Sequence, residues 1–239
     1  MSAWNSAIVV GASSGIGREL VKQLAAQGCR VTALARREEL LAELASDLVR
    51  VYQHDVHAVG EVEALFEQIE ADQGPVDLVV YSTGILVRPG LDVYDTAADA
   101  ESVAVNLTGA MAWMNAAAPK FQARGTGTLV AIGSVAGDRG RRAVPAYHAS
   151  KAGLATFMES MRNRLVRHGV TVVTVKPGPV DTDMTRGLGL KRMMPVEKAA
   201  AIILKKARRS GEFYLSPVHA VMFAVIRAIP SPIFRRLNV

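Results

Sequence analysis

A tyrosine and a lysine four residues apart are the clearest candidates for acid–base chemistry. Tyr147-His-Ala-Ser-Lys151 would place a phenol and an ammonium group on one face of a helix. A phenol with a pKa near 10 exchanges protons poorly at neutral pH until a nearby cation favours its phenolate form, and Lys151 can supply that cation. We therefore expect Tyr147 to exchange a proton with a substrate. The alternative is a core tyrosine followed by an exposed lysine.

Two other polar residues fit the same chemistry by their order in the chain. Ser134 lies just past an apolar run at 127–132, and Asn106 lies in a predicted helix further upstream. Because ligands of parallel α/β sheets bind at the carboxyl ends of the strands, Ser134 could hydrogen-bond a substrate oxygen. Asn106 could hold a water that links Lys151 to solvent. The alternatives are a turn serine and a helix-interior asparagine.

A glycine-rich turn near the N-terminus predicts a dinucleotide site. Gly11-Ala-Ser13-Ser14-Gly15-Ile16-Gly17 follows an apolar run and precedes a helical pattern, which is the context that such a turn requires. Gly11 would make the tight turn, Gly15 would let backbone approach a pyrophosphate, and Gly17 would permit close packing of helix on sheet. Free N–H groups at the helix N-terminus would bind phosphate. A nicotinamide cofactor would then supply the hydride that accompanies the Tyr147 proton.

Two arginines favour NADP(H) over NAD(H). NAD sites usually carry an acidic residue at the end of the second strand to hold the ribose 2′-hydroxyl, but here the chain reads Leu34-Ala-Arg36-Arg37. Guanidinium groups suit a 2′-phosphate in charge and in bidentate geometry. The alternative is a solvated arginine pair at a helix start, where positive charge is slightly unfavourable.

The rest of the sequence predicts one α/β domain that spans residues 1–239. Short apolar runs alternate with helical patterns, which is typical of βαβ units in a parallel sheet covered by helices on both faces. We therefore expect a doubly wound, three-layer Rossmann-like fold with a mostly parallel, seven-stranded sheet. Six strand candidates stand out: Ala7–Val10, Arg30–Leu34, Val49–Tyr52, Asp77–Tyr81, Gly127–Ile132 and Val170–Val175.

Composition narrows the functional classes. The single cysteine, Cys29, rules out a disulfide framework and a multi-cysteine metal site, and we predict no metal. The N-terminus lacks a signal-peptide pattern, so we expect a cytoplasmic protein. The net charge of +6 is uneven: residues 1–185 carry 17 basic and 20 acidic side chains, and residues 186–239 carry 11 and 2. Nucleic-acid binding by this basic region is disfavoured because exposed aromatics and a recognisable motif are missing.

These motifs together resemble the short-chain dehydrogenase/reductase family over nearly the whole chain. The resemblance rests on the glycine turn, Asn106, Ser134, Tyr147-x-x-x-Lys151 and Pro177-Gly178. It implies Asp55 and Val56 beside the adenine, Gly84 after the fourth strand, and Pro177, Gly178, Val180 and Thr182 near the nicotinamide. It also implies a homodimer or homotetramer. One departure is Tyr81-Ser-Thr-Gly84, where the family usually has Asn-Asn-Ala-Gly, so the usual support of that turn is missing.

A narrower resemblance concerns the substrate. The segment 137–142 and the ending from Val221 to Leu237 are similar to the branch that reduces a decaprenylphosphoryl-2-keto-pentose. It implies a lipid-linked ketosugar as substrate and peripheral contact of the tail, residues 212–239, with the inner face of the membrane. The alternative is a tail that packs on its own domain or on a partner subunit. Substrate loops are expected at 85–89, 137–144 and 184–194, with residues 184–210 as a lid.

The sequence as a whole thus predicts an NADP(H)-dependent ketone reductase for a medium or large apolar substrate. A catalytically idle NADP(H)-binding redox sensor is the alternative from another class. An epimerase or dehydratase on the same fold is disfavoured because the chain leaves little room for a separate substrate domain.

Overall fold

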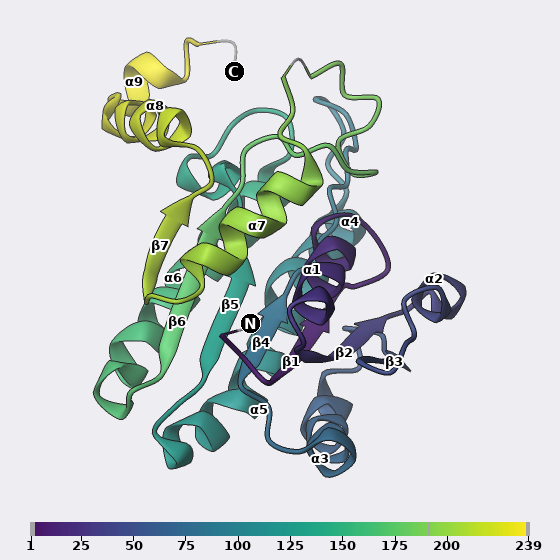
Figure 1. Cartoon of the computed structure of the whole chain (residues 1–239). Coiled ribbons are helices and arrows are strands. Elements are labelled where there is room, and N and C mark those ends of the chain that lie inside the picture. Colours follow the sequence, from purple (N-terminus) through teal and green to yellow (C-terminus); the bar gives the residue numbers. More distant parts are fainter. Residues whose placement is uncertain (1–2, 191, 238–239) are drawn as a thin grey trace.

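The computed structural model describes residues 3–190 and 192–237, and its centre is a parallel sheet (Figure 1). Seven strands are hydrogen-bonded in the order β3-β2-β1-β4-β5-β6-β7, and every neighbouring pair is parallel. The strands are β1 (Ser6–Val10), β2 (Arg30–Ala35), β3 (Val49–Gln53), β4 (Leu78–Tyr81), β5 (Thr128–Ile132), β6 (Thr171–Lys176) and β7 (Gly211–Tyr214).

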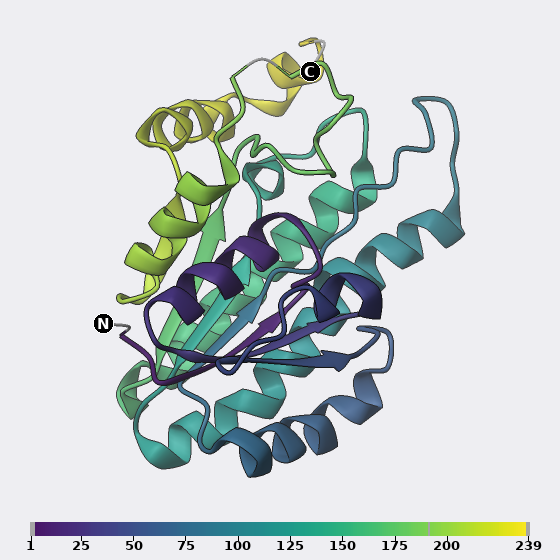
Figure 2. The same cartoon turned by 45° about the vertical axis from the view of Figure 1, so that its right-hand side comes forward.

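Helices cover both faces of the sheet, which makes three layers (Figure 2). One face carries α1 (Gly15–Ala26) and α7 (Val196–Lys206), and the other carries α3 (Val62–Gln73), α5 (Gly109–Arg124) and α6 (Pro145–Leu165). A hydrophobic core lies on each face of the sheet, and successive strand residues point into one core or the other. Val9 packs toward α1, and Ile8 and Val10 pack toward the helices of the opposite face. Strands buried on both faces can be apolar throughout, which explains the uninterrupted Val/Ile runs of the sequence.

The remaining elements are short. They are α2 (Glu38–Ala42), α4 (Thr96–Val103), α8 (Pro217–Ala228), α9 (Ser231–Phe234), three 3₁₀ turns at Val59–Glu61, Val135–Asp138 and Val166–His168, and a π-helix at Ala104–Thr108. Asp95 caps α4 by accepting hydrogen bonds from the amides of Ala97 and Ala98, both at 3.0 Å.

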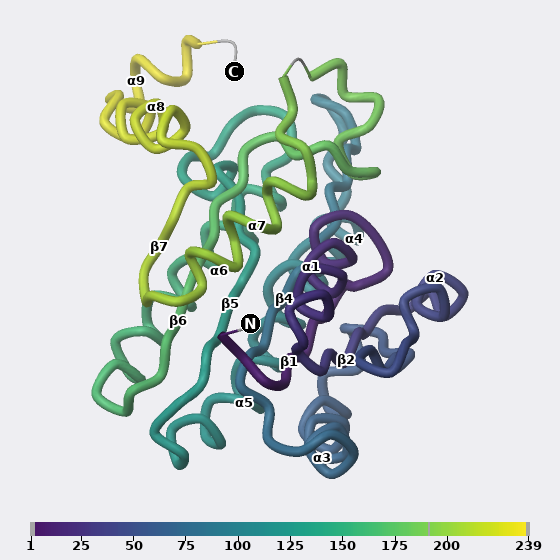
Figure 3. The backbone as a smooth tube through the Cα atoms, in the orientation of Figure 1, coloured from purple at the N-terminus to yellow at the C-terminus, as the bar shows by residue number. Residues whose placement is uncertain are grey.

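The strand order reverses between β1 and β4, so the connections that leave these two strands diverge to opposite faces. In open α/β sheets the crevice outside the carboxyl ends at such a switch point is the usual ligand site. The backbone trace shows the loops after β1, β4, β5 and β6 gathered at this edge (Figure 3).

The expected fold is confirmed, and the six strand candidates match the observed strands to within one residue at each end. The seventh strand, β7, lies in the segment that we expected to be a tail. It pairs with β6, and α8 and α9 follow it beyond the edge of the sheet (Figure 1).

In the structure, the segment expected to be a lid and the segment expected to be a tail each contain two parts with different surroundings. Residues 184, 185, 188 and 190 line a cavity, but α7 packs against α1 through Ala199, Ala200 and Ile203 and so belongs to the core. In the tail, Phe223 of α8 is buried. The guanidinium of Arg139 donates to the carbonyls of Ile226, Arg227 and Ile229 at 3.2, 3.1 and 2.7 Å, which ties the end of α8 to the loop after β5. One side of the tail therefore packs on its own domain.

Candidate active site

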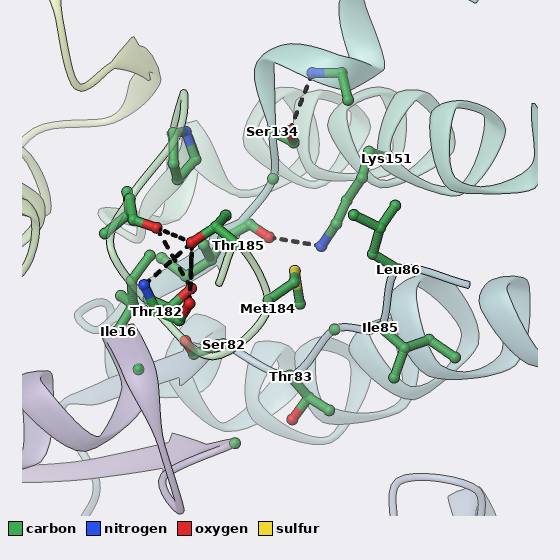
Figure 4. A pocket seen from close by; sticks show the side chains of 18 of the residues that line it. Ile16, Ser82, Thr83, Ile85, Leu86, Ser134, Lys151, Thr182, Met184 and Thr185 are labelled. Carbon is green, nitrogen blue, oxygen red and sulfur yellow. Dashed lines mark hydrogen bonds between the residues drawn. The ribbon is translucent and has the colours of Figure 1, made fainter. Parts of the chain in front are cut away.

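One cavity of about 680 Å³ lies at the carboxyl edge of the sheet. Segments that follow β1, β2, β4, β5 and β6 line it together with α6 and α8. Figure 4 shows Ser134 and Lys151 on one side of it, Ile85 and Leu86 on another, and Thr182, Met184 and Thr185 across from them. All of the site residues expected from the sequence line this cavity except Gly17, Asp55 and Asn106.

The glycine turn has the backbone that only glycine adopts easily. Gly11 and Gly15 have φ values of +90° and +54°. A Cβ on Gly11 would lie 2.6 Å from the Thr83 amide nitrogen, and one on Gly17 would lie 2.1 Å from the Gly11 carbonyl oxygen. Gly11 thus lets the turn after β1 touch the turn after β4, and Gly17 lets α1 begin directly against that turn.

The N-terminus of α1 is open to an anion. Ser14 occupies the N-cap position, but its side chain makes no capping hydrogen bond, and the first turn contains no acidic residue. The Ser13 and Ser14 hydroxyls instead accept hydrogen bonds from the Arg37 guanidinium at 2.8 and 3.0 Å. The unpaired N–H groups, the helix dipole and the Arg37 charge therefore act on the same end of the cavity. These features fit the phosphates of a dinucleotide.

Arg36 and Asp55 lie at the outer rim. The Arg36 side chain is largely exposed, and its guanidinium lies 4.0 Å from the Asp55 carboxylate. Asp55 also accepts hydrogen bonds from the backbone and ring nitrogens of His57, which hold its pKa below the ordinary value against the opposing effect of burial. Asp55 thus lies outside the cavity, whereas its neighbour Val56 lines it.

Ser134, Tyr147 and Lys151 come together from two elements. Ser134 caps the start of the 3₁₀ turn Val135–Asp138 after β5, and its hydroxyl accepts a hydrogen bond from the Ala136 amide at 3.0 Å. Lys151 lies one helical turn after Tyr147 on α6, with its ammonium nitrogen 5.9 Å from the centre of the Tyr147 ring. This ammonium is buried and donates to the Ile132 carbonyl at 3.1 Å. The three residues that the sequence singled out therefore share one wall of the cavity.

The electrostatics of Tyr147 differ from the sequence-based expectation. Burial raises the pKa of Tyr147 above its ordinary value of 10, and Ser134 through hydrogen bonding and Arg141 through its charge act in the opposite direction. Arg141, which the sequence analysis did not single out, is thus a cation that acts on this phenol, and the ammonium of Lys151 lies 5.9 Å from its ring. Burial in turn lowers the pKa of Lys151 to about 8, because desolvation disfavours the ammonium form.

Asn106 acts on the loop after β4. It is fully buried in the π-helix, where its amide oxygen accepts from the Ile85 amide at 2.8 Å. Its amide nitrogen donates to the Ile85 carbonyl at 3.0 Å and to the Ser150 hydroxyl at 3.1 Å. A Cβ on Gly84 would lie 3.2 Å from the Asn106 oxygen and 3.3 Å from the Lys151 nitrogen. Asn106 therefore positions the backbone of Gly84 and Ile85, which lies between Asn106 and Lys151.

The turn at Tyr81-Ser-Thr-Gly84, which differs from the family's usual Asn-Asn-Ala-Gly, is held in place by a different hydrogen bond. The buried Tyr81 hydroxyl donates to the Val105 carbonyl of the π-helix at 2.5 Å. Gly109 makes room for it, because a Cβ there would lie 2.5 Å from the Tyr81 oxygen. Tyr81 and Asn106 together hold the turn after β4 against the π-helix.

The sequence analysis did not single out several residues that line the cavity. Arg141 comes from the loop before α6, and His219, Met222 and Phe223 come from α8. The loop of Arg141 had been named as a substrate loop, whereas α8 had been treated only as an apolar tail. The spacing of His219, Met222 and Phe223, three and four residues apart, was the available signal that one face of this helix is shared.

Comparison with known proteins defines the class. The family model for short chain dehydrogenases matches residues 5–192. An uncharacterized oxidoreductase of Streptomyces coelicolor is 34% identical over 98% of this chain and 96% of its own length. A short-chain dehydrogenase from Burkholderia cenocepacia, solved in complex with NADP, has a TM-score of 0.85 and 26% identity over 98% of this chain and 97% of its own. An actinorhodin polyketide ketoreductase, solved with NADPH, has a TM-score of 0.79 and 27% identity over 90% and 97%.

The fold and the cavity are those of an α/β oxidoreductase with a nucleotide-binding turn. The chain belongs to the short-chain dehydrogenase family, whose members bind nicotinamide cofactors. Within the part of the chain that the structure describes, no helix is both long enough and apolar enough to cross a membrane.

Proposed function

We propose that this protein is an NADP(H)-dependent ketone reductase in which Tyr147 gives the proton to the substrate oxygen. The observation that carries this proposal is that Ser134, Tyr147 and Lys151 line the same cavity as the glycine turn. The bound cofactor would supply the hydride. The chain's own residues hold the phosphates, orient the carbonyl and deliver the proton.

The cofactor residues divide by the part of the dinucleotide that each would hold. The glycine turn, with Ser13, Ser14 and Ile16, and the first turn of α1 would take the pyrophosphate. Arg36 and Arg37 would take the 2′-phosphate, Asp55 and Val56 the adenine, and Gly84, Pro177, Gly178, Val180 and Thr182 the nicotinamide half. Arg37 is already oriented by its hydrogen bonds to Ser13 and Ser14. Two of the structural relatives were solved with NADP or NADPH.

The protonation of Tyr147 is compatible with reduction. Because burial raises its pKa, the phenol is protonated at neutral pH and is ready to act as an acid. That state suits reduction, in which the carbonyl oxygen gains a proton as hydride arrives at carbon. Ser134 would hydrogen-bond the same oxygen, and Lys151 would return a proton to Tyr147.

Replacement of Tyr147 by phenylalanine tests catalysis against the sensor alternative. The variant keeps the ring and removes only the proton carrier, so NADPH affinity should stay within about twofold. NADPH oxidation with a ketone panel should fall by at least 100-fold, the lower range of general acid–base contributions. If the unmodified protein turns over no ketone or alcohol while both proteins bind NADPH equally, a non-catalytic NADP(H)-binding sensor becomes the better description.

Reversal of charge at Arg36 tests the cofactor assignment. Arg36→Asp should weaken NADPH binding by 10-fold or more and leave NADH binding nearly unchanged, because only NADPH carries the 2′-phosphate. Arg167→Asp, an exposed position before β6 that lies outside the cavity, is the matched control for net charge. Equal loss of both cofactors, or loss of neither, would contradict the preference for NADP(H).

For the substrate we propose a lipid-linked ketosugar met at an anionic membrane surface. The outer side of α8 supports this idea: Val218, Val221 and Val225 follow helical spacing and are 71%, 68% and 60% exposed. Three arginines, Arg227, Arg235 and Arg236, flank this apolar stripe, and no acidic residue follows Glu212. An apolar face bordered by basic side chains is the pattern of a helix that lies on anionic lipid. His219, Met222 and Phe223 connect the same helix to the cavity.

Vesicle binding tests this surface. Val221→Glu should abolish sedimentation with vesicles that contain anionic lipid, whereas Val166→Glu should not. Val166 lies before β6 and is similarly exposed, at 60% against 68% for Val221. Lipid-linked ketosugars should be reduced faster when presented in such vesicles. If the protein ignores vesicles and Val221→Glu instead converts a dimer or tetramer to smaller species in sedimentation velocity, then the stripe is a subunit interface.

A further inference from the structure

Four side chains that line the cavity have a buried polar atom without a hydrogen-bond partner among the described residues: His54, Thr83, Arg141 and His219. Thr83 lies against the glycine turn, and the pair considered below, Arg141 and His219, comes from the loop before α6 and from α8. Arg141 Nε and His219 Nδ1 are inaccessible to solvent, and neither atom is bonded to any of the residues that the structure describes. Arg141 also forms no ion pair within the described ranges, although burial lowers its pKa. Buried polar groups are normally paired, and leaving one unpaired is destabilising. Such groups in a cavity wall point to a ligand that satisfies them.

Both residues line the cavity that contains Tyr147. The charge of Arg141 acts directly on the Tyr147 phenol and lowers its pKa. His219 packs on the turn after β6, because a Cβ on Gly178 would lie 2.0 Å from His219 Cε1 and 2.4 Å from Nδ1. The absence of a side chain at Gly178 therefore makes room for the imidazole beside the turn that we assign to the nicotinamide half.

The charge of the cavity wall is mainly positive. Asp183 is the one carboxylate in the cavity wall, and it is mostly exposed and pairs with Arg186 at 3.0 Å. The buried cation of the cavity wall, Lys151, already donates to the Ile132 carbonyl. Arg37 donates to Ser13 and Ser14 at the glycine turn, and Arg88 is exposed. Arg141 is thus a half-buried cation of the cavity wall that no carboxylate among the described residues pairs with.

We propose that Arg141 and His219 form an oxyanion subsite that binds a carboxylate or phosphate group of the substrate next to the reacting carbonyl. The planar guanidinium suits both anions, and His219 Nδ1 donates the additional hydrogen bond. This inference rests on the proposed carbonyl reduction. It defines the substrate class as ketones that carry an anionic group near the carbonyl, and a phosphodiester-linked ketosugar is one member.

Steady-state kinetics with matched ketones test the subsite. The probes are a keto acid, its neutral methyl ester and a phosphorylated ketose, each with saturating NADPH. A hydrogen bond to a charged group contributes about 1.5–3 kcal/mol, so Arg141→Met should lower kcat/KM for the two anionic ketones by about 10- to 150-fold. The ester should lose only the part that Arg141 contributes through Tyr147, so the readout is the ratio of kcat/KM for each anionic ketone to kcat/KM for the ester, which should fall in Arg141→Met. Preference between keto acid and phosphorylated ketose identifies which anion is the better fit.

Two controls separate a local subsite from general charge. Arg142→Met removes the same charge from the next, exposed position, which lies outside the cavity, and should leave the anionic preference intact. His219→Asn keeps a donor near the position of Nδ1 and should retain most of the preference, whereas His219→Leu should lose it. Equal losses for ester and acid in Arg141→Met, or an equal effect of Arg142→Met, would overturn the proposal.

A binding measurement keeps the subsite testable if turnover is never found. Calorimetry on the protein with NADP⁺ should detect the hydroxy acid that corresponds to the keto acid, with an affinity that falls with salt and is lost in Arg141→Met. Failure of turnover with this binding intact would refute only the proposed reduction. Turnover of neutral ketones without anion binding would refute only the subsite.

Discussion

Replacement of Gly137 by alanine should push the Ser134 turn away from α6. A Cβ on Gly137 would lie 2.7 Å from the carbonyl carbon of Lys151, 2.8 Å from its oxygen and 2.9 Å from the amide nitrogen of Ala152. Non-bonded heavy atoms prefer separations of about 3.5–4.0 Å, so the two segments must separate by about 1 Å. Both sides of the contact are backbone, and no side-chain rotation can relieve it.

The size of the effect follows from this displacement. Overpacking of this kind costs about 1–3 kcal/mol of folding free energy. For a chain of this size, that cost corresponds to a fall in Tm of about 2–12 °C. Ser134 begins the same turn and Lys151 is the contacted residue, so the shift separates the candidate catalytic groups. A misplacement of about 1 Å can cost about 100-fold in rate.

The assay compares Gly137→Ala with Gly140→Ala in the same loop. Gly140 does not have a positive φ, and a Cβ there would meet nothing within 4 Å, so its substitution should be neutral or slightly stabilising. Gly137→Ala should lower Tm and lower kcat/KM about 100-fold with any ketone that the protein reduces, while NADPH binding changes little. If Gly137→Ala keeps kcat/KM within threefold and its Tm is unchanged, or if Gly140→Ala loses as much, then the close contact does not position the site.

Three other perturbations have defined outcomes. Lys176→Met removes the cation that lies 2.6 Å from the buried Asp138 carboxylate and 2.6 Å from the partly exposed Glu212 carboxylate. It should lower the free energy of unfolding, measured by urea denaturation, by about 3–5 kcal/mol. An unchanged urea midpoint would show that other groups balance the charge of the two carboxylates. Asn106→Leu removes both hydrogen bonds to the backbone of Ile85, so amide exchange at Ile85 should accelerate at least 10-fold, and full retention of protection would contradict this role. For Lys151, burial lowers the pKa from 10.5 to about 8, so between these values the unfolded chain binds the proton that the folded chain has released. Stability should therefore rise from about pH 8 to 10.5, and Lys151→Met should lose that rise.

The fold was largely predictable because its signals are local. Parallel strands that are buried on both faces consist of continuous apolar residues, so the ends of six strands could be predicted to within one residue. The seventh, β7, was not separated from the tail because Gly211–Tyr214 is short and is only partly buried at the edge of the sheet. Likewise, α7 was taken as part of a lid, since nothing in its own pattern shows that the face with Ala199 and Ile203 packs on α1.

The candidate site was predictable where one short segment carries the chemistry. The glycine turn and the Tyr147–Lys151 pair were found because φ preference and helical spacing are properties of neighbouring residues. The hydrogen bonds of Asn106 to the backbone of Ile85 were not predicted, because Ile85 is distant in sequence and the π-helix that contains Asn106 has no recognised sequence signal. The predicted role of Asn106 in holding a water stays a prediction.

The sequence by itself therefore determined the class of chemistry, through a turn that only glycines allow and a phenol one helical turn before an ammonium. The tertiary structure decided the electrostatics of that phenol. Burial raises the pKa of Tyr147, Arg141 from the loop before α6 opposes the rise, and Lys151 is directed to the Ile132 carbonyl. Desolvation and charge–charge distance depend on which segments meet at the sheet edge, and residue spacing along the chain does not encode them. The presence of His219 in the cavity wall likewise depends on where α8 packs in the tertiary structure.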